Sequence, residues 1–253
     1  MAGSRIPVVT AHGEGRAVFG DGHKAGKATA CVRFVDNRGK PTEVFPLTLF
    51  SVGGMMAFVA AGDLLTMFVA LEVLSFPLYI MTALARRKRL LSQEAALKYF
   101  LLGSLSSAFF LFGAALLYGF AGSVSLERIG QAIGTVDVGE GLLLPGVLMV
   151  MFGLLFKIGA WPFHNWVPDV YQGAPTPVTG FMAACTKVAA FGALLRLAYV
   201  GVAQSRWDWL FILWIVAGVT MVVGAVLTLT QSDMKRLLAY SSISHAGFIL
   251  YLS

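Results

Sequence analysis

The chain has 253 residues, of which 57% are hydrophobic and only 13% are charged. Soluble domains carry about 25% charged residues, and a mean hydropathy of +0.77 also excludes an ordinary soluble protein. The net charge of +6 does not indicate a nucleic-acid-binding protein, because the basic residues stand in loops between apolar segments. Cytoplasmic loops of membrane proteins have this pattern. The composition therefore predicts an integral protein of the lipid bilayer.

The first 44 residues differ from the rest, because they are polar and Gly-rich. A signal peptide would need about 7–15 consecutive apolar residues, and this segment has no such run. We predict that residues 1–44 form a disordered leader. The two cysteines, Cys31 and Cys185, do not have the spacing of a metal site or a disulfide framework. We therefore predict no bound metal.

Apolar segments follow the leader, and several are long enough for a membrane-spanning helix. The expected spans, about seven in number, are residues 45–62, 63–85, 99–122, 142–160, 176–202, 207–231 and 239–253. The last segment has about 15 residues where a span needs about 20, so we expect the sequence to be a fragment that ends inside a helix. The predicted fold class is all-α, a polytopic membrane helix bundle.

Lysine and arginine gather in two of the connections between the expected spans. Residues 86–98 form a strongly basic loop, and residues 232–239 contain Lys235 and Arg236. Positively charged loops face the cytoplasm, and counting spans places both loops on one side. We therefore expect a multi-pass protein of the bacterial inner membrane with these two loops in the cytoplasm.

Three ionisable side chains lie deep inside the expected spans: Glu72, Lys157 and Lys187. One such residue at the bilayer centre costs roughly 2.5–3.5 kcal/mol, so these groups must pair with one another or face water. One interpretation is a buried Glu–Lys ion pair that only joins helices. The other is a proton or ion path through the bundle, because buried lysines and glutamates can exchange protons near neutral pH.

Pro162 follows Lys157 closely, in the stretch "GLLFKIGAWPFHNWVPDVYQGAPTP". Proline removes a helical hydrogen bond and clashes with the preceding turn. Membrane helices tolerate such breaks where they line a cavity or pack inside the protein, and the carbonyl end of a helix favours a cation. We therefore expect a discontinuous helix whose break at Pro162 makes a polar site for Lys157, as at the ion sites of transporters.

Two histidines are further candidates for a relay. His164 follows the predicted break, and His245 lies in the last apolar segment. Histidine titrates near neutral pH and can carry protons. A single buried histidine is also commonly a hydrogen-bonded structural residue, so both interpretations stay open for each.

Three blocks of sequence resemble the antiporter-like membrane subunits of respiratory complex I, and most closely the subunit N family of bacterial NADH-quinone oxidoreductase. They are "GDLLTMFVALEVLSFPLYIMTALARRKRLLSQEAALKYF", "FKIGAWPFHNWVPDVYQGAPTPVTGFMAACTKVAAF" and "SDMKRLLAYSSISHAGF". The resemblance covers residues 43–253. The stretches "TEVFPL" and "ARRKRLLSQEAALKYF" suggest an actinobacterial member of the family. Unlike the family, this chain begins with a polar leader in place of three further helices.

The resemblance implies a fold of inverted five-helix repeats, each with a discontinuous helix. Residues 45–202 would form the first repeat, and residues 203–253 the incomplete start of the second. The resemblance also implies that Glu72, Lys157 and Lys187 carry protons, while His245 lies along a hydrated axis. No cofactor is expected on this chain; NADH, flavin, iron–sulfur clusters and quinone are expected in partner subunits. The implied partners are other membrane subunits of complex I, with no nucleic acid.

Three functions remain open on the sequence. The first is a proton-translocating subunit, or translocase, of NADH-quinone oxidoreductase, which couples electron transfer in other subunits to proton movement. The second is a subunit of a multi-subunit cation/proton antiporter, in which the same charged residues would serve. The third is a membrane scaffold that transports nothing and uses Glu72, Lys157 and Lys187 to join helices.

Overall fold

The computed structural model describes residues 15–19, 32–36, 43–85, 89–133, 135 and 140–252. It divides into two units, Met1–Leu49 and Phe50–Ser253. The first unit contains an antiparallel pair of strands, β1 (Gly15–Phe19) and β2 (Val32–Asp36). The sequence patterns did not predict these strands. Most other residues of the leader, 1–44, lie outside the described residues, so its disorder stays a prediction.

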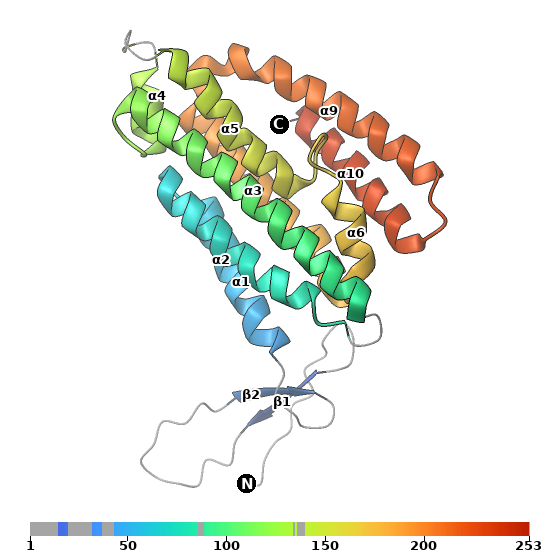
Figure 1. Cartoon of the computed structure of the whole chain (residues 1–253). Coiled ribbons are helices and arrows are strands. Elements are labelled where there is room, and N and C mark those ends of the chain that lie inside the picture. Colours follow the sequence, from blue (N-terminus) through green and yellow to red (C-terminus); the bar gives the residue numbers. More distant parts are fainter. Residues whose placement is uncertain are drawn as a thin grey trace, which may run out of the picture. The chain divides into compact units, whose positions relative to one another are not determined.

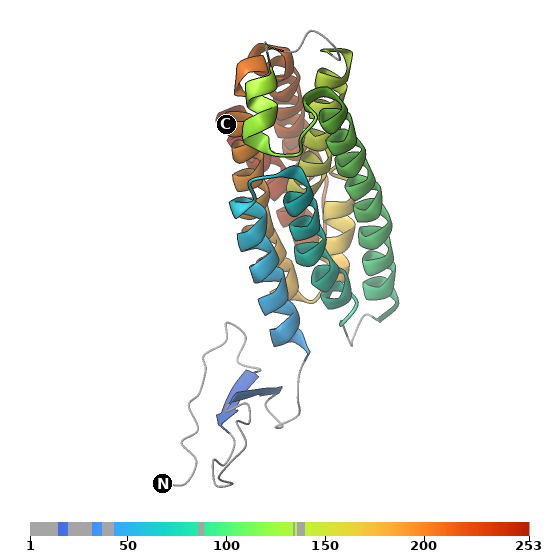
Figure 2. The same cartoon turned by 90° about the vertical axis from the view of Figure 1, so that its left-hand side faces the viewer.

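The second unit is a bundle of helices that run side by side (Figure 1, Figure 2), which confirms the predicted helical fold class. The helix α1 (Val44–Ala60) begins in the first unit and continues into the second. The helices that follow are α2 (Leu64–Thr82), α3 (Arg89–Ala121), α4 (Leu126–Ala132), α5 (Glu140–Ile158) and α6 (Trp166–Gly173). A nearly continuous helix then joins α7 (Thr176–Phe181), the π-helical η1 (Met182–Thr186), α8 (Lys187–Arg196) and the π-helical η2 (Leu197–Gly201). After the 3₁₀ turn η3 (Ala203–Ser205) come α9 (Arg206–Leu229) and α10 (Met234–Leu252).

Five of the described helical segments are long and apolar enough to cross a membrane, which corrects the expected seven. They are α2, α3, Gly141–Ile158, Thr176–Gly201 and Ala203–Leu229. The helix α1 is apolar but has only 17 residues. The helix α10 is not among the five, because Lys235, Arg236 and His245 lower its hydropathy.

The basic connections are more helical than the sequence analysis expected. In place of a loop over 86–98, α3 begins at Arg89 and runs for 33 residues. Residues 86–98 lack glycine and proline, and the amine of Lys98 lies 2.8 Å from the carboxylate of Glu94. Such a pair, spaced four residues apart, stabilises a helix. Similarly, α10 begins at Met234, so most of the predicted loop 232–239 is its first turns.

Close packing between α3 and α5 depends on glycines. A Cβ atom built on Gly113 of α3 would lie 2.7 Å from the carbonyl oxygen of Gly146 on α5. One built on Gly153 of α5 would lie 2.8 Å from the Cβ of Phe110. The hydroxyl of Ser106 also donates to the carbonyl oxygen of Gly153, at 3.0 Å. Small residues let membrane helices approach closely, and this contact positions the end of α5 against the middle of α3.

Asp63 stands at the N-terminus of α2 and caps it. Its carboxylate accepts the amide hydrogen of Thr66 at 2.8 Å and the hydroxyl of Thr66 at 2.7 Å. These bonds lower the pKa of Asp63 from its ordinary value, the amide of Thr66 having the largest effect. The cap fixes where α2 begins and therefore where Glu72 lies along it.

Candidate functional site

The apolar helix α5 ends beside Lys157, its penultimate residue. The next residue after the helix is Gly159, whose φ of +80° is in the left-handed region. The amides of Gly159 and Ala160 both donate to the carbonyl of Leu155, at 2.9 and 3.0 Å, as in a glycine-terminated helix. The helix therefore ends at Gly159 rather than at Pro162, which lies in the following loop. This corrects the expectation that Pro162 terminates the helix.

The loop after the break is held on both sides. The indole nitrogen of Trp166, the first residue of α6, donates to the carbonyl of Phe156 at 2.9 Å. The amide of Trp161 donates to the hydroxyl of Thr220 on α9 at 3.0 Å. A backbone carbonyl at membrane depth needs a partner inside the protein. Trp166 is such a partner for the Phe156 carbonyl, and its hydrogen bond joins α5 to α6.

Lys157 lies in a niche of aromatic side chains. The residue is 3% exposed, and its Nζ lies 3.3 Å from the hydroxyl oxygen of Tyr99. The same nitrogen lies 5.1 Å from the ring centre of Tyr99 and 5.6 Å from that of Tyr79. Both distances are within the range of cation–π interactions. The amine therefore has a hydroxyl and two ring faces around it, and no ion-pair partner among the described residues.

Further aromatic contacts fix the tyrosines of this niche. The rings of Tyr79 and Tyr99 meet edge to face at 4.7 Å. Tyr99 also stacks on Trp166 with 4.7 Å between ring centres, and Trp166 stacks on Phe156 at 5.4 Å. The niche is thus built from α2, α3, α5 and α6. The sequence did not predict that either tyrosine contacts Lys157. Both are far from Lys157 along the chain, and no motif distinguishes them from the other aromatic residues.

Glu72 lies half-buried on α2, and its carboxylate accepts a hydrogen bond from Ser107 of α3. The structure brings Glu72 and Lys157 to the same group of helices without an ion pair between them in the described part of the chain. Tyr79 follows Glu72 on the same helix and supplies a ring to the niche of Lys157. The sequence left open a buried Glu–Lys ion pair that only joins helices, and the structure does not have this pair between Glu72 and Lys157.

Lys187 begins α8, directly after the π-helical segment η1. Its Nζ donates to the carbonyl and to the hydroxyl of Ser242 on α10, at 2.7 and 2.8 Å. The hydroxyl of Tyr171 on α6 lies beside the same serine. π-Helical turns are frequent at functional sites. Ser242 and Tyr171 were not predicted, since their distance from Lys187 along the chain gives no signal of the contact.

The two histidines have different surroundings. His164, in the loop after the break, is buried, and its Nδ1 has no hydrogen-bond partner within the described structure. His245 is exposed on α10, where its ring lies 6.4 Å from that of Phe248. The structure does not bring either histidine into contact with Lys157 or Lys187 through any hydrogen bond found among the described residues.

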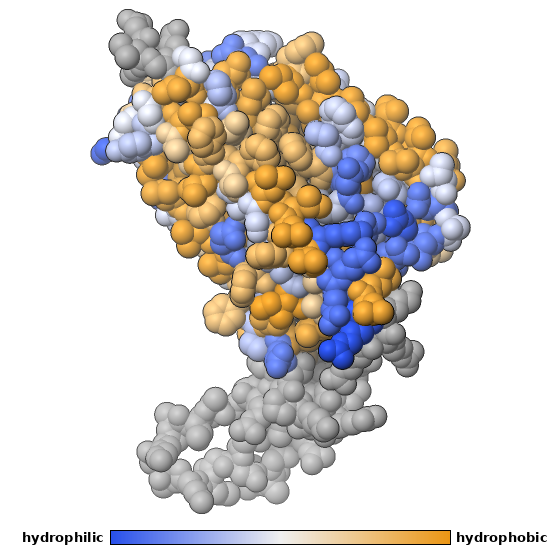
Figure 3. All heavy atoms as spheres, in the orientation of Figure 1, coloured by the Kyte–Doolittle hydropathy of each residue, from blue (hydrophilic) through white to orange (hydrophobic). Residues whose placement is uncertain are grey.

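Charged residues gather at one end of the bundle, where α6 meets the first turns of α3 and α10. The carboxylate of Asp169 lies 3.0 Å from the amine of Lys98 and 2.7 Å from the guanidinium of Arg236. Figure 3 shows a patch of hydrophilic residues in this region of a largely apolar face. The sequence predicted positive charge at this end, but not that Asp169 would join both helices to α6.

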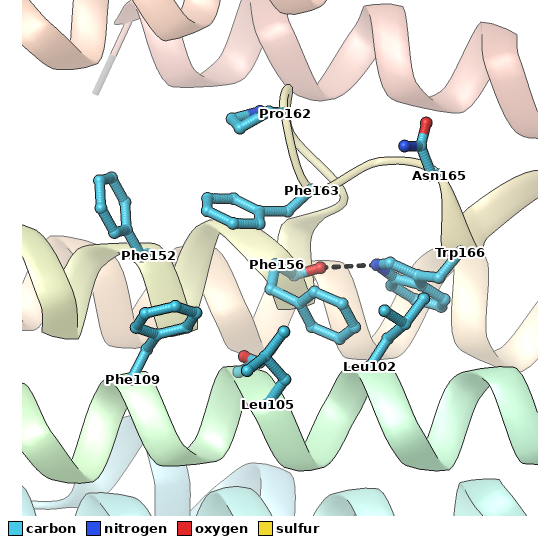
Figure 4. Close-up of a pocket in the computed structure, with 10 residues that line it drawn as sticks. Leu102, Leu105, Phe109, Phe152, Phe156, Pro162, Phe163, Asn165 and Trp166 are labelled. Atoms are coloured by element: carbon cyan, nitrogen blue, oxygen red, sulfur yellow. Dashed lines mark hydrogen bonds between the residues drawn. The ribbon is translucent and has the colours of Figure 1, made fainter.

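An apolar pocket of about 110 Å³ lies beside the break. Figure 4 shows the side chains of Phe152, Phe156 and Phe163 gathered around it, with Trp166 at one end. The remaining lining residues are Leu102, Leu105, Ser106, Phe109, Pro162 and Asn165. Pro162 therefore contributes to this pocket rather than to the end of the helix.

The sequence model of the family described as "NADH:quinone oxidoreductase/Mrp antiporter, TM" matches residues 61–253. The chain belongs to this family. It is 65% identical over 209 residues to NADH-quinone oxidoreductase subunit N of Beutenbergia cavernae, covering 83% of this chain and 39% of that protein. The resemblance found in the motifs is thereby confirmed, and many similar relatives are actinobacterial. The chain spans 39–48% of the length of such relatives.

Solved members of the NADH:quinone oxidoreductase/Mrp antiporter family share the fold. One chain of respiratory complex I from Thermus thermophilus with bound aureothin is 47% identical, with a TM-score of 0.69 over 82% of this chain and 44% of that one. A chain of the Mrp complex from a Dietzia species is 25% identical, with a TM-score of 0.74 over 81% of this chain and 38% of that one. The architecture is thus common to both branches of the family.

Proposed function

We propose that this chain acts as a proton-translocating membrane subunit of NADH-quinone oxidoreductase. The observation that carries the proposal is the site of Lys157: a buried amine at the end of a broken apolar helix, beside a hydroxyl and two rings instead of a carboxylate. A lysine without a bound countercharge can change its protonation state as nearby charges change. The 65% identity to a subunit named for this enzyme supports the same function.

In this proposal, Glu72, Lys157 and Lys187 carry protons in turn. They lie on three of the helical segments that are long and apolar enough to cross a membrane. Ser107 donates a hydrogen bond to Glu72, and Tyr79, on the same helix as Glu72, supplies a ring to the niche of Lys157. We propose His164 and His245 as additional relay positions; the unpartnered Nδ1 of His164 supports a water-mediated role for that residue.

Electron transfer would take place in other subunits. We propose that NADH, flavin, iron–sulfur clusters and quinone bind to partner subunits, while this chain holds none of them and moves protons. Among the described residues no group of histidine, cysteine and carboxylate side chains could hold a metal ion. The proposed partners are the other membrane subunits of the complex.

We also propose the orientation and the division into repeats. Arg89 and Lys98 lie in the first three turns of α3, and Lys235 and Arg236 lie in the first turn of α10. The positive-inside rule would place them in the cytoplasm of a bacterial cell. Residues 45–202 would form the first five-helix repeat, and residues 203–253 would begin the second. A cysteine placed at Arg89 in a variant with Cys31 and Cys185 replaced by alanine should react with an impermeant maleimide in inside-out vesicles, and not in intact cells.

The alternative is a subunit of a cation/proton antiporter, which the fold shared with the Mrp complex favours. Affinity purification of the tagged protein in mild detergent, followed by mass spectrometry of its partners, separates the two functions. Recovery with the NADH-oxidising subunits supports the proposal. Recovery with antiporter subunits alone would replace it with the alternative.

A scaffold function is tested through Lys187. Lys187→Met should leave the complex assembled and NADH oxidation measurable, but should abolish or strongly reduce proton pumping. Arg89→Met is a suitable control, because Arg89 is an exposed cation at the start of α3 and its loss should leave pumping unchanged. Full pumping by an assembled Lys187→Met complex would remove this residue from the relay.

A further inference from the structure

We propose that Tyr99 is the positioning residue of Lys157, holding its amine in one place through both protonation states. The inference rests on the proposed function, in which Lys157 carries a proton. It adds a residue on α3 to a relay whose other members were recognised from their charge. Nothing in the composition of the third span distinguishes Tyr99 from the other aromatic residues around it.

The geometry of the hydroxyl is the first reason. The oxygen of Tyr99 lies 3.3 Å from Nζ of Lys157, and both residues are buried, with Tyr99 at 0% and Lys157 at 3% exposure. Within the described part of the chain, this is the hydrogen bond found for the amine. The contact joins residues 58 positions apart in sequence, so it depends on how α3 and α5 pack.

The rigidity of Tyr99 is the second reason. Its ring is clamped between the edge-to-face contact with Tyr79 and the stacking contact with Trp166. Trp166 is fixed in turn by its hydrogen bond to Phe156, the residue immediately before Lys157. The hydroxyl therefore has a fixed position relative to the last turn of α5, and the amine that binds it is fixed as well.

The chemistry of the partner is the third reason. A carboxylate at this distance would stabilise the ammonium form strongly and hold the proton on lysine. A phenol oxygen accepts a hydrogen bond from the ammonium and also, more weakly, from the neutral amine. The ring faces of Tyr79 and Tyr99 add attraction for the ammonium without a countercharge. The niche thus holds the amine in place while leaving both protonation states accessible.

The titratable groups that act on this amine come from two helices. They are Glu72 and Tyr79 on α2 and Tyr99 on α3. Among the described residues of α6, α8 and α9, no charged side chain forms a hydrogen bond or an ion pair with it. Deleting the Tyr99 hydroxyl should therefore act on Lys157 directly, and should weaken the ammonium form more than the neutral form.

The test compares Tyr99→Phe with Lys157→Met and with Tyr118→Phe in the intact complex, in inside-out membrane vesicles. Tyr99→Phe keeps the ring and removes only the hydroxyl, while Tyr118 is an exposed tyrosine on the same helix and serves as the control. Proton pumping is measured across pH, per assembled complex, with NADH oxidation recorded in parallel. Because the pumping rate is divided by the amount of assembled complex, variants that assemble in smaller amounts can still be compared.

We expect Tyr99→Phe to lower pumping several-fold and to move the alkaline limb of its pH profile down by about one unit, since a charge-assisted hydrogen bond is worth about that much. Tyr118→Phe should match the wild type. If Lys157→Met abolishes pumping while Tyr99→Phe retains the wild-type rate and profile, the positioning role of Tyr99 is wrong and the proposed function stands. If Lys157→Met pumps normally, the proposed function itself fails.

Discussion

The indole nitrogen of Trp166 donates a 2.9 Å hydrogen bond to the carbonyl of Phe156, and this bond joins the end of α5 to the start of α6. The same indole stacks on the ring of Tyr99. One tryptophan therefore both satisfies a carbonyl at the helix break and supports the tyrosine that contacts Lys157. The side chain of Trp166 therefore fixes both the backbone at the break and the aromatic niche around Lys157.

Trp166→Phe is expected to destabilise the break while keeping most of the stacking. The Phe156 carbonyl would keep only the amide of Gly159 as a donor, at 3.0 Å, and the loss of the indole bond should cost about 0.5–1.5 kcal/mol. We expect a lower melting temperature for the purified complex in detergent, together with reduced pumping. An unchanged melting temperature would show that this hydrogen bond does not hold the broken helix together.

Gly159→Ala tests the correction to the position of the helix end. A left-handed conformation costs a non-glycine residue about 1–2 kcal/mol, and the new Cβ would lie 2.7 Å from a methyl group of Val167. We expect clear destabilisation, measured by thermal denaturation in detergent. Gly180→Ala is the matched control, because its Cβ would meet nothing within 4 Å. Equal effects of the two substitutions would contradict this account of the break.

Asp169→Asn should weaken the attachment of α6 to α3 and α10. The substitution weakens the contacts with Lys98 and Arg236 at once, for a loss on the order of 1 kcal/mol, since partly exposed ion pairs are screened by water. Glu94→Gln removes the helical pair with Lys98 alone and should cost only about 0.3–0.5 kcal/mol. Melting temperatures at low and high salt provide the measurement. The idea fails if Asp169→Asn costs no more than Glu94→Gln.

The cap at Asp63 predicts a specific pH dependence. Because the hydrogen bond from the amide of Thr66 lowers the pKa of Asp63, its contribution to stability is present above the ordinary carboxyl pKa and is lost as the pH falls through the lowered value. The melting-temperature difference between wild type and Asp63→Ala should be complete at about pH 6 and should shrink below about pH 4. A difference that does not change with pH would argue against capping by the carboxylate.

Much of the helical architecture could be predicted from the sequence, because the apolar runs are long and their interruptions are charged. The cap at Asp63 and the presence of a break after Lys157 also follow from local chemistry. The position of the helix end could not be derived, because Pro162 gives a stronger signal than Gly159 until the backbone angle is known. The length of α3 was underestimated, since the basic residues after Ala85 resemble a loop although the residues that follow favour a helix.

The partners of the charged residues lay beyond sequence reasoning. Tyr99 contacts Lys157, and Ser242 contacts Lys187, across 58 and 55 positions of the chain. Periodicity shows that a residue lies inside a span, but not which face of another helix it meets. The expectation that the buried charges pair with one another or face water was also incomplete, because hydroxyls and aromatic faces accept lysine as well.

The most direct measurement is the ratio of protons pumped to NADH oxidised by the complex carrying Lys157→Met, in sealed inside-out vesicles. The account predicts that NADH oxidation stays measurable while the ratio falls well below that of the wild type, because the amine in the tyrosine niche is lost. A wild-type ratio in the assembled Lys157→Met complex would contradict the claim that this lysine carries protons.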